Sequence, residues 1–259
     1  MAKVHSGAKL AKDVKVEAFA TIYEDVEIGE GSWIGPNTVI MNGARIGKNV
    51  QVYPGAVISG DPQDMKYQGE PTTAEIGDNT IIREYVTINK GTKANDRTVV
   101  GKNCLIMSYV HIAHDCVLND HVILGSYAGL AGEVEVDNWA IVSPGCLVHQ
   151  FVRIGAHVMI QGGSRVSKDV PPFAMAGREP VSFTGINSIG LRRRGFSNDT
   201  IYAIQEVFRI IYQRGLNISD ALEFVVANLP ASNERDEIVL FIRRSKRGII
   251  RGYFDGKEA

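Results

Sequence analysis

The chain has 259 residues, enough for one large domain or one domain with an appendage, and its hydrophobic content of 44% argues against disorder. Lys and Arg number 28 against 29 Asp and Glu, so there is no net basic field that would attract nucleic acid or an anionic membrane. The sequence holds neither a secretory signal nor an apolar run of about 18 residues, so we expect a cytoplasmic protein without a membrane span.

Residues 4–166 carry an aliphatic residue at nearly every sixth position. Of the 28 positions in this register, 25 are Val, Ile or Leu, and the exceptions are Asp64, Glu70 and Ala94. Small or β-branched residues recur four positions later, and Gly and Asn, which accept positive φ, recur between them. This period predicts a parallel β-helix in which three successive hexads close one triangular coil.

The three cysteines occupy the small-residue position of this hexad pattern. They are Cys104, Cys116 and Cys146, an odd number without a zinc-type spacing. We therefore expect reduced core thiols rather than a disulfide framework or a metal cluster.

Two polar segments interrupt the pattern without changing its register. Residues 61–75 and 91–98 contain turn-forming residues, and the six-residue count continues on either side of each. We expect both to be outward loops on a rigid scaffold, which is a common position for functional residues.

The hexads stop at residues 170–172, and helical periodicity follows. Ser197, Ser219 and Ser232 are each predicted to cap a helix. Residues 1–180 carry a net charge of −4 and residues 181–259 a net charge of +3, so we expect a β-helix domain over 1–180 and a small α-helical domain over 181–259. The basic residues of this second domain could meet an acidic partner or form an ordinary solvated face. They are Arg209, Arg214, Arg243, Arg244, Lys246, Arg247 and Arg251.

His114 is the leading candidate for catalysis. Steps of one coil from His114 reach Gly132 and then Gln150, so the three should stack about 4.8 Å apart per step. Acyl transfer to an alcohol needs a general base near neutral pH and a fixed donor for the oxyanion, roles that an imidazole and a glycine N–H can fill. Asp115 could orient the imidazole, but only if the backbone turns there, because adjacent strand residues diverge.

A zinc site is the alternative for these histidines. His111, His114 and His121 resemble the three-histidine metal site of γ-class carbonic anhydrases, which also use a β-helix. Those enzymes lack a C-terminal helical domain of this kind, so we expect no metal.

Several longer motifs carry a resemblance that extends over nearly the whole chain. They are QDMKYQGEP (63–71), HIAHDC (111–116), VHQF (148–151), IGAHVM (154–159), KDVPPFAMAG (168–177) and GLRRRGFS (190–197). In order and spacing these motifs resemble the acyl-carrier-protein-dependent UDP-N-acetylglucosamine O-acyltransferases, which open lipid A biosynthesis in Gram-negative bacteria. The resemblance implies a left-handed β-helix. The general preference for right-handed connections would not predict this hand, so it rests on the resemblance alone.

The resemblance also implies a reaction and its residues. His114 would take the proton from the glucosamine 3-hydroxyl, which attacks the thioester of a (R)-3-hydroxyacyl chain, and Gly132 would donate to the oxyanion. Gln63, Asp64 and Lys66 match substrate-holding positions in the first loop. The other matched substrate positions are His111, His149 and Gln150 in the cleft, Gly162 beside the acyl chain, and Asn187, Arg193 and Arg194 beside the nucleotide.

Three residues depart from the family pattern. Asn89 and Glu133 stand where the family often has His, and Ile189 stands where an acidic residue is common. The choice between a 3-hydroxyl and a 3-amine acceptor therefore stays open, and Gln161 beside Gly162 leaves the acyl-chain length open. A CoA-dependent sugar or amino-acid O- or N-acyltransferase on the same β-helix remains the alternative function.

The resemblance further implies the assembly and the partners. Family members form homotrimers with the cleft shared between neighbours, so we expect a homotrimer. The acidic acyl carrier protein is expected to dock on the basic residues of the helical domain. No cofactor is expected, since phosphopantetheine arrives on the carrier protein.

Overall fold

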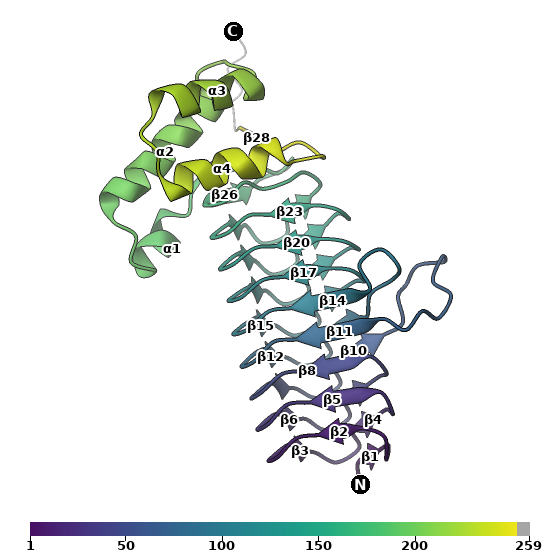
Figure 1. Ribbon diagram of the computed structural model, residues 1–259. Helices are drawn as coiled ribbons and strands as arrows, with labels where there is room; N and C mark the ends of the chain where they lie inside the picture. Colours follow the sequence, from purple (N-terminus) through teal and green to yellow (C-terminus); the bar gives the residue numbers. More distant parts are fainter. Residues whose placement is uncertain (253–259) are drawn as a thin grey trace.

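The computed structural model describes residues 1–252 and shows a prism of short parallel strands with helices folded over one end (Figure 1). The N-terminus lies at the opposite end of the prism (Figure 1). Residues 253–259 of the predicted helical domain lie outside the described residues. The division of the chain at residue 180 stays a prediction, and strands from both sides of that position join one sheet.

The strands form the three faces of the prism. Sheet A consists of β1 (Lys3–Val4), β4 (Thr21–Ile22), β7 (Val39–Ile40), β10 (Val57–Gly60), β13 (Thr87–Asn89), β16 (His111–Ile112), β19 (Gly129–Leu130), β22 (Leu147–Val148) and β25 (Arg165–Val166). Sheet B consists of β2 (Lys9–Leu10), β5 (Val26–Ile28), β8 (Ala44–Ile46), β11 (Thr73–Ile76), β14 (Arg97–Val100), β17 (Val117–Leu118), β20 (Glu135–Val136) and β23 (Arg153–Ile154). Sheet C consists of β3 (Lys15–Val16), β6 (Trp33–Ile34), β9 (Gln51–Val52), β12 (Ile81–Ile82), β15 (Leu105–Ile106), β18 (Ile123–Leu124), β21 (Ile141–Val142), β24 (Met159–Ile160), β26 (Ala174–Gly177), β27 (Ser182–Ile186) and β28 (Arg251–Gly252).

The pairing of strands confirms the predicted coil of three hexads. Through β25, each strand pairs in parallel with the strand three places earlier in the chain. Ile112 pairs with Leu130, and Leu130 pairs with Val148, so hexad positions stack directly from one coil to the next. Parallel sheets normally need long crossovers, but here each crossover is the remaining two sides of the triangle.

Both predicted loops leave the prism at the same edge. Ile58 pairs with Ile88, and Ile76 pairs with Val100. Both intervals are longer than the three hexads of a plain coil, because the segments between the strands bulge outward. Each loop connects a strand of sheet A to the next strand of sheet B, and Figure 1 shows both projecting from the prism beside β11 and β14. We call this edge the AB corner, and the other two edges the BC corner and the CA corner.

The aliphatic hexad positions fill the core, as predicted. Ile34, Ile58 and Ile82 have no exposed surface, and the three free cysteines are buried beside them. Burial raises the pKa of Cys104 to about 11 and that of Cys116 to about 12. These thiols stay protonated and unreactive at neutral pH, which confirms that they are core residues.

Aromatic residues at the CA corner adopt the left-handed backbone conformation that we expected of Gly and Asn. Tyr85, Tyr109 and Tyr127 have φ values of 57°, 63° and 62°. Their rings stack coil upon coil with centroids 5.1 Å and 4.9 Å apart. Stacking of this kind contributes about 0.5–1.5 kcal/mol per pair, enough to offset much of the backbone strain.

Four helices follow the prism in the part of the chain that the structure describes. They are α1 (Ser188–Arg193), α2 (Asn198–Gln213), α3 (Ile218–Asn228) and α4 (Asn233–Arg243). Ser197 caps α2 and Ser232 caps α4, as predicted. The prediction for Ser219 was wrong: Asn217 is extended and its side chain accepts the Asp220 N–H at 2.9 Å, so α3 begins earlier. None of the helices within residues 1–252 is long and apolar enough to cross a membrane.

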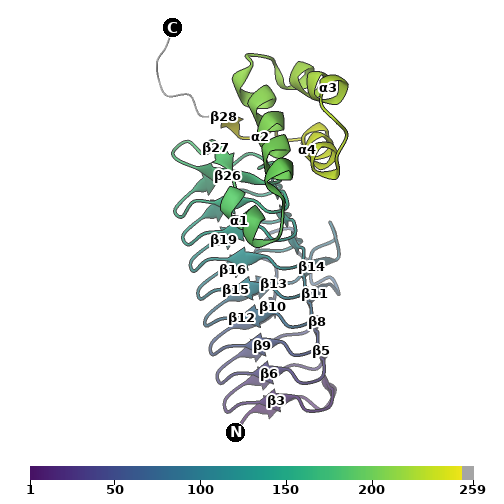
Figure 2. The same cartoon turned by 90° about the vertical axis from the view of Figure 1, so that its left-hand side faces the viewer.

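Aromatic packing joins the helices to the end of sheet C. The ring of Phe183 on β27 stacks against Phe208 and Tyr212 of α2, with centroids 4.8 Å and 4.7 Å apart. The Tyr212 hydroxyl donates to the Ile250 carbonyl at 3.0 Å. Figure 2 shows that α1 lies against the side of the prism, whereas α3 and α4 lie near its end.

Candidate active site

The AB corner collects most of the residues that the sequence analysis singled out. His114, Gly132 and Gln150 each occupy the turn between a strand of sheet A and the next strand of sheet B. The first loop, which carries Gln63, Asp64 and Lys66, leaves from the same corner nearer the N-terminus. The stacking of coils therefore places residues from several distant chain segments along one edge.

His114 and Asp115 form a hydrogen-bonded pair. Asp115 has a φ of 61°, and this turn of the backbone brings its Oδ2 within 2.8 Å of His114 Nδ1. The imidazole is 15% exposed and the carboxylate is fully buried. Because an ionised carboxylate only accepts hydrogen bonds, Nδ1 carries the proton and Nε2 presents its lone pair to the cleft. The condition that the sequence analysis placed on Asp115 is met.

Gly132 lies directly against the imidazole. A Cβ at position 132 would lie 2.6 Å from His114 Cε1 and 2.7 Å from Nε2, so only glycine leaves room for the ring in this position. The coils are joined here by the Glu133 N–H, which donates to the His114 carbonyl at 3.0 Å. The Gly132 N–H donates to no acceptor within residues 1–252, so it is available to a ligand.

The neighbouring histidines have different surroundings. His111 lies in β16, and its Nδ1 is 2.7 Å from the Thr87 hydroxyl. Burial lowers the pKa of His111, which favours a neutral ring at neutral pH. His149 is exposed, with its Nδ1 3.1 Å from the carbonyl of Gln150. His111 is in the same coil as His114, and His149 lies two coils further on, on the same side of the prism.

The first loop brings a carboxylate toward Glu133. Asp64 Oδ1 accepts the Lys66 N–H at 3.0 Å, which closes a tight turn, and Gln63 and Lys66 are exposed. Burial raises the pKa of Glu133, and the negative charges of Asp115 and Asp64 raise it further. Asp64 therefore lies within electrostatic reach of Glu133, the residue that follows Gly132.

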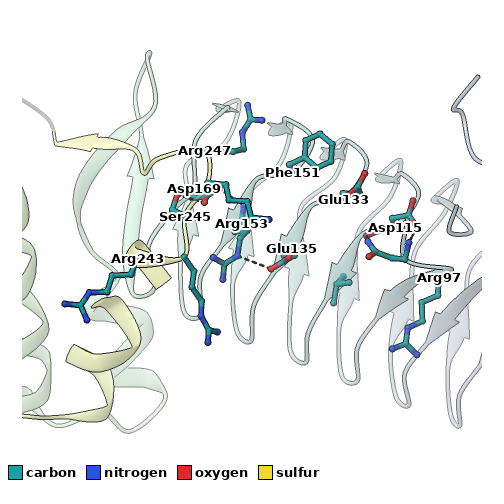
Figure 3. Close-up of a pocket in the computed structure, with 14 residues that line it drawn as sticks. Arg97, Asp115, Glu133, Glu135, Phe151, Arg153, Asp169, Arg243, Ser245 and Arg247 are labelled. Atoms are coloured by element: carbon teal, nitrogen blue, oxygen red, sulfur yellow. Dashed lines mark hydrogen bonds and ion pairs between the residues drawn. The ribbon is translucent and has the colours of Figure 1, made fainter. Parts of the chain in front are cut away.

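A groove of about 1170 Å³ runs along sheet B from the AB corner toward α4 (Figure 3). Asp115 and Glu133 lie at one end, and Arg243 and Arg247 lie at the other. Between them, Arg153 donates to Glu135 at 3.0 Å and lies over the ring of Phe241. The groove thus connects the surroundings of the His114–Asp115 pair with basic residues of the helical region.

The predicted nucleotide residues lie at a different edge. Asn187 is buried and caps α1: its side chain accepts the Gly190 N–H at 3.1 Å and donates to the His157 carbonyl at 2.9 Å. Arg193 is exposed in the same helix. Because His157 belongs to the BC corner, the structure does not bring these residues to His114 within one chain.

Arg194 is held in place by an aromatic residue that the sequence analysis missed. Its guanidinium lies 5.1 Å above the Trp139 ring, and its Nη2 donates to the Trp139 carbonyl at 3.2 Å. His121 stacks on the Trp139 ring at 3.8 Å, so it belongs to the BC corner rather than to a cluster with His111 and His114. His121 and Trp139 are three hexads apart in the sequence, and this interval could have indicated the stack.

One polar atom of Arg194 has no partner. Its Nη1 is buried and makes no hydrogen bond within residues 1–252, and the same holds for Nδ1 of His157. A buried guanidinium nitrogen without a partner is costly, so this atom is suited to donate a hydrogen bond to an anionic or carbonyl ligand.

Gly162 stands at the third edge, the CA corner. It is exposed, and a Cβ there would meet the Pro144 carbonyl at 3.2 Å. The candidate residues of one chain are thus divided among all three corners. Within residues 1–252, no three His, Cys, Asp or Glu side chains gather as a metal site.

Comparison with protein families matches most of the length of the chain. Residues 169–250 match the model described as UDP N-acetylglucosamine O-acyltransferase, domain 2, and residues 25–60 and 97–132 match bacterial transferase hexapeptide repeats. The sequence is 43% identical over 252 residues to the acyl-(acyl-carrier-protein)–UDP-N-acetylglucosamine O-acyltransferase of Xanthomonas oryzae, covering 96% of each chain. It is 52% identical over 193 residues to that of Chlorobium phaeobacteroides, covering 74% of this chain and 73% of the relative.

Solved structures match the whole architecture. A UDP-N-acetylglucosamine acyltransferase from Bacteroides fragilis superposes with a TM-score of 0.95 at 53% identity, covering 96% of this chain and 98% of the other. The enzyme from Francisella novicida superposes with a TM-score of 0.94 at 39% identity, covering 96% and 92%. Together with the parallel sheets and the hexapeptide repeats, these matches support a left-handed β-helix.

Replacing Gly132 with Ala should disable the site without unfolding the prism. The new methyl group would displace the His114 imidazole, so we expect kcat to fall at least roughly tenfold, a small part of what a positioned acid–base group contributes. Gly129→Ala is the matched control, because its Cβ meets only the flexible end of Leu147. Equal kcat values for the two variants, at equal melting temperatures, would show that the contact between Gly132 and His114 does not matter.

Proposed function

This chain belongs to the family of acyl-(acyl-carrier-protein)–UDP-N-acetylglucosamine O-acyltransferases, and we propose that His114 is the general base of its reaction. The reaction transfers a (R)-3-hydroxyacyl chain from acyl carrier protein to the 3-hydroxyl of UDP-N-acetylglucosamine, the first step of lipid A biosynthesis. The observation that carries the proposal is the His114–Asp115 pair packed against Gly132.

The proposed step begins at Nε2 of His114. This nitrogen takes the proton of the sugar 3-hydroxyl while the hydroxyl oxygen bonds to the thioester carbonyl carbon. The electron pair of the carbonyl moves to its oxygen, and the Gly132 N–H donates to that oxyanion. When the carbon–sulfur bond breaks, the imidazolium returns the proton to the departing sulfur, and Asp115 stabilises the charged ring in between.

The other substrate contacts are proposed from the resemblance to the family. Asp64 and Lys66 on the first loop would hold the sugar and a phosphate, with Gln63 beside them. His111, His149 and Gln150 would line the cleft around the thioester. Gly162 would leave room for the acyl chain at the CA corner.

At the BC corner, a fork of guanidinium groups from Arg193 and Arg194 would bind the pyrophosphate. The unpaired Nη1 of Arg194 supports this role. Asn187 already uses its side chain to cap α1, so its contribution would be to fix the position of these arginines.

A homotrimer explains the division of the residues among three corners. The base, the arginines and Gly162 of one chain face different directions, so a substrate long enough to touch all three needs corners from neighbouring chains. We therefore assign the site to the cleft between subunits of a cyclic trimer.

Mixing two inactive variants tests this assignment. His114→Ala and Arg194→Ala would each be purified as inactive protein, unfolded together and refolded as mixed trimers. In a shared cleft, some sites receive both intact residues, so we expect activity to return to roughly a quarter of the wild-type value. No recovery, with mixed trimers verified by mass, would contradict a site shared between subunits.

The carrier protein is proposed to dock on a basic collar made of Arg165, Lys168, Arg244, Lys246, Arg247 and Arg251. Lys168 continues the column of His114, Gly132 and Gln150 by one more coil, and its Nζ donates to the Arg247 carbonyl at 2.5 Å. Arg209 and Arg243, also considered from the sequence, are paired with Glu206 and Glu223. No metal, redox nucleotide or ATP enters the proposed step, and a cytoplasmic location stays a prediction.

Reversing two charges of the basic collar tests the docking of the carrier protein. The double variant Lys246→Glu, Arg247→Glu should lower kcat/KM for the acyl carrier protein donor roughly tenfold at low salt, because complementary charge mainly accelerates encounter. Lys12→Glu, at the far end of the prism, is the control.

A panel of carrier-protein thioesters and CoA thioesters as donors separates this function from the CoA-dependent alternative. If CoA thioesters are turned over and carrier-protein thioesters are not, the proposed donor is wrong.

Replacing His114 with Ala tests the base itself. We expect the trimer and its melting temperature to persist while kcat falls by roughly 10²–10⁴, the contribution of a positioned acid–base group. Turnover of UDP-N-acetylglucosamine with a 3-hydroxyacyl carrier protein is the measurement. Activity within twofold of wild type would remove His114 from the mechanism.

A further inference from the structure

The carboxylate of Asp115 is held by more than the imidazole. It is fully buried, and its two oxygens accept four hydrogen bonds. Oδ2 accepts from His114 Nδ1 at 2.8 Å and from the Thr92 hydroxyl at 2.6 Å. Oδ1 accepts from the Thr92 N–H at 2.9 Å and from the Asn95 N–H at 3.2 Å. Three of the four donors therefore come from the second loop, residues 91–98.

The backbone of Asp115 is tied to the same segment. Its N–H donates to the Thr98 hydroxyl at 2.8 Å, and its carbonyl accepts from the Asn95 side chain at 3.5 Å. A residue other than glycine is strained at a φ of 61°, and it keeps this conformation only where the surrounding structure holds it. The second loop supplies that constraint, although it lies well before Asp115 in the chain.

The second loop is in turn attached to the first. The Thr72 hydroxyl donates to the Gly91 carbonyl at 2.5 Å, and the Gly91 N–H donates to the Thr73 carbonyl at 3.1 Å. Within the loop, the Asp96 N–H donates to the Thr92 carbonyl at 2.8 Å. The loop that would hold the sugar and the loop that holds Asp115 thus form one connected unit.

We propose that Thr92 is a positioning residue for the general base. Its N–H and its hydroxyl each bind one oxygen of Asp115, and this fixes the carboxylate in the orientation that keeps the proton on Nδ1 of His114. The inference rests on the proposed role of His114. Thr92 contacts neither the sugar nor the thioester in this scheme, and it acts only through Asp115.

The side chain of Thr92 also affects the negative charge on the Asp115 oxygen that faces the imidazole. Its hydroxyl withdraws electron density from Oδ2, the same oxygen that faces His114. Without that donor, Oδ2 holds more negative charge and stabilises the imidazolium more strongly. Glu133, which interacts with the ring, and Asp64, which interacts with Glu133, are unchanged by such a substitution.

Thr92→Val removes the hydroxyl and keeps the shape and the backbone N–H. We expect kcat to fall roughly tenfold, the loss typical of one hydrogen bond to a charged group, with KM values within twofold. The acid limb of the pH profile of kcat/KM should move to higher pH. Thr92→Ser should restore both, and Thr73→Val, which removes a hydroxyl bonded to Glu75 instead, is the matched control.

A double-mutant cycle with Asp115→Asn completes the test. If Thr92 acts only through Asp115, Thr92→Val should cause no further loss of kcat in the Asp115→Asn background. Additive losses, or a Thr92→Val profile identical to wild type, would overturn the inference. Should Thr92→Val fail to fold, Thr92→Ala read against Thr92→Ser supplies the same comparison. A fully active His114→Ala variant would instead contradict the proposed function, so the two failures are distinguishable.

Discussion

The stacking of one coil on the next determines where the candidate groups at the corners of the prism lie. Each backbone amide of a strand pairs with the coil beside it, and the aliphatic residues inside stack in the same register, as Ile112, Leu130 and Val148 do. A slip of one residue would turn the buried side chains outward, so the register is strongly fixed. Residues three hexads apart in the sequence consequently become direct neighbours at a corner.

The periodic part of the structure could be predicted from the sequence because it depends on one interaction, the stacking of each hexad on the hexad one coil away. The aliphatic ladder, the buried cysteines and the contact of His114 with Gly132 all follow from the repeat of three hexads per coil. The role of Thr92 could not be read, since it lies in a loop outside the hexads and its partner Asp115 is on a different coil. Likewise, Asn217 and Ser219 are equally good caps, and only the observed backbone decides between them.

Corners are where the prism can leave a backbone N–H free for a ligand, as at Gly132, because the backbone of the faces is used for hydrogen bonding between coils. Asp115 reaches His114 only through a left-handed backbone turn, and the same kind of turn lets Trp139 support Arg194 at another corner. The two loops add groups that a bare prism lacks. In the function proposed above, one chain carries the base at one edge and an anion-binding arginine at another, so a substrate would join them across neighbouring chains.

A crystal structure with UDP-N-acetylglucosamine bound would test the central claim, that coil stacking presents Nε2 of His114 to the acceptor beside a bare glycine amide. We expect the sugar 3-oxygen within hydrogen-bond reach of Nε2, roughly 2.6–3.2 Å, with Nδ1 still bonded to Asp115. A sugar held at another corner, or a ring turned so that Nδ1 faces the sugar, would contradict it.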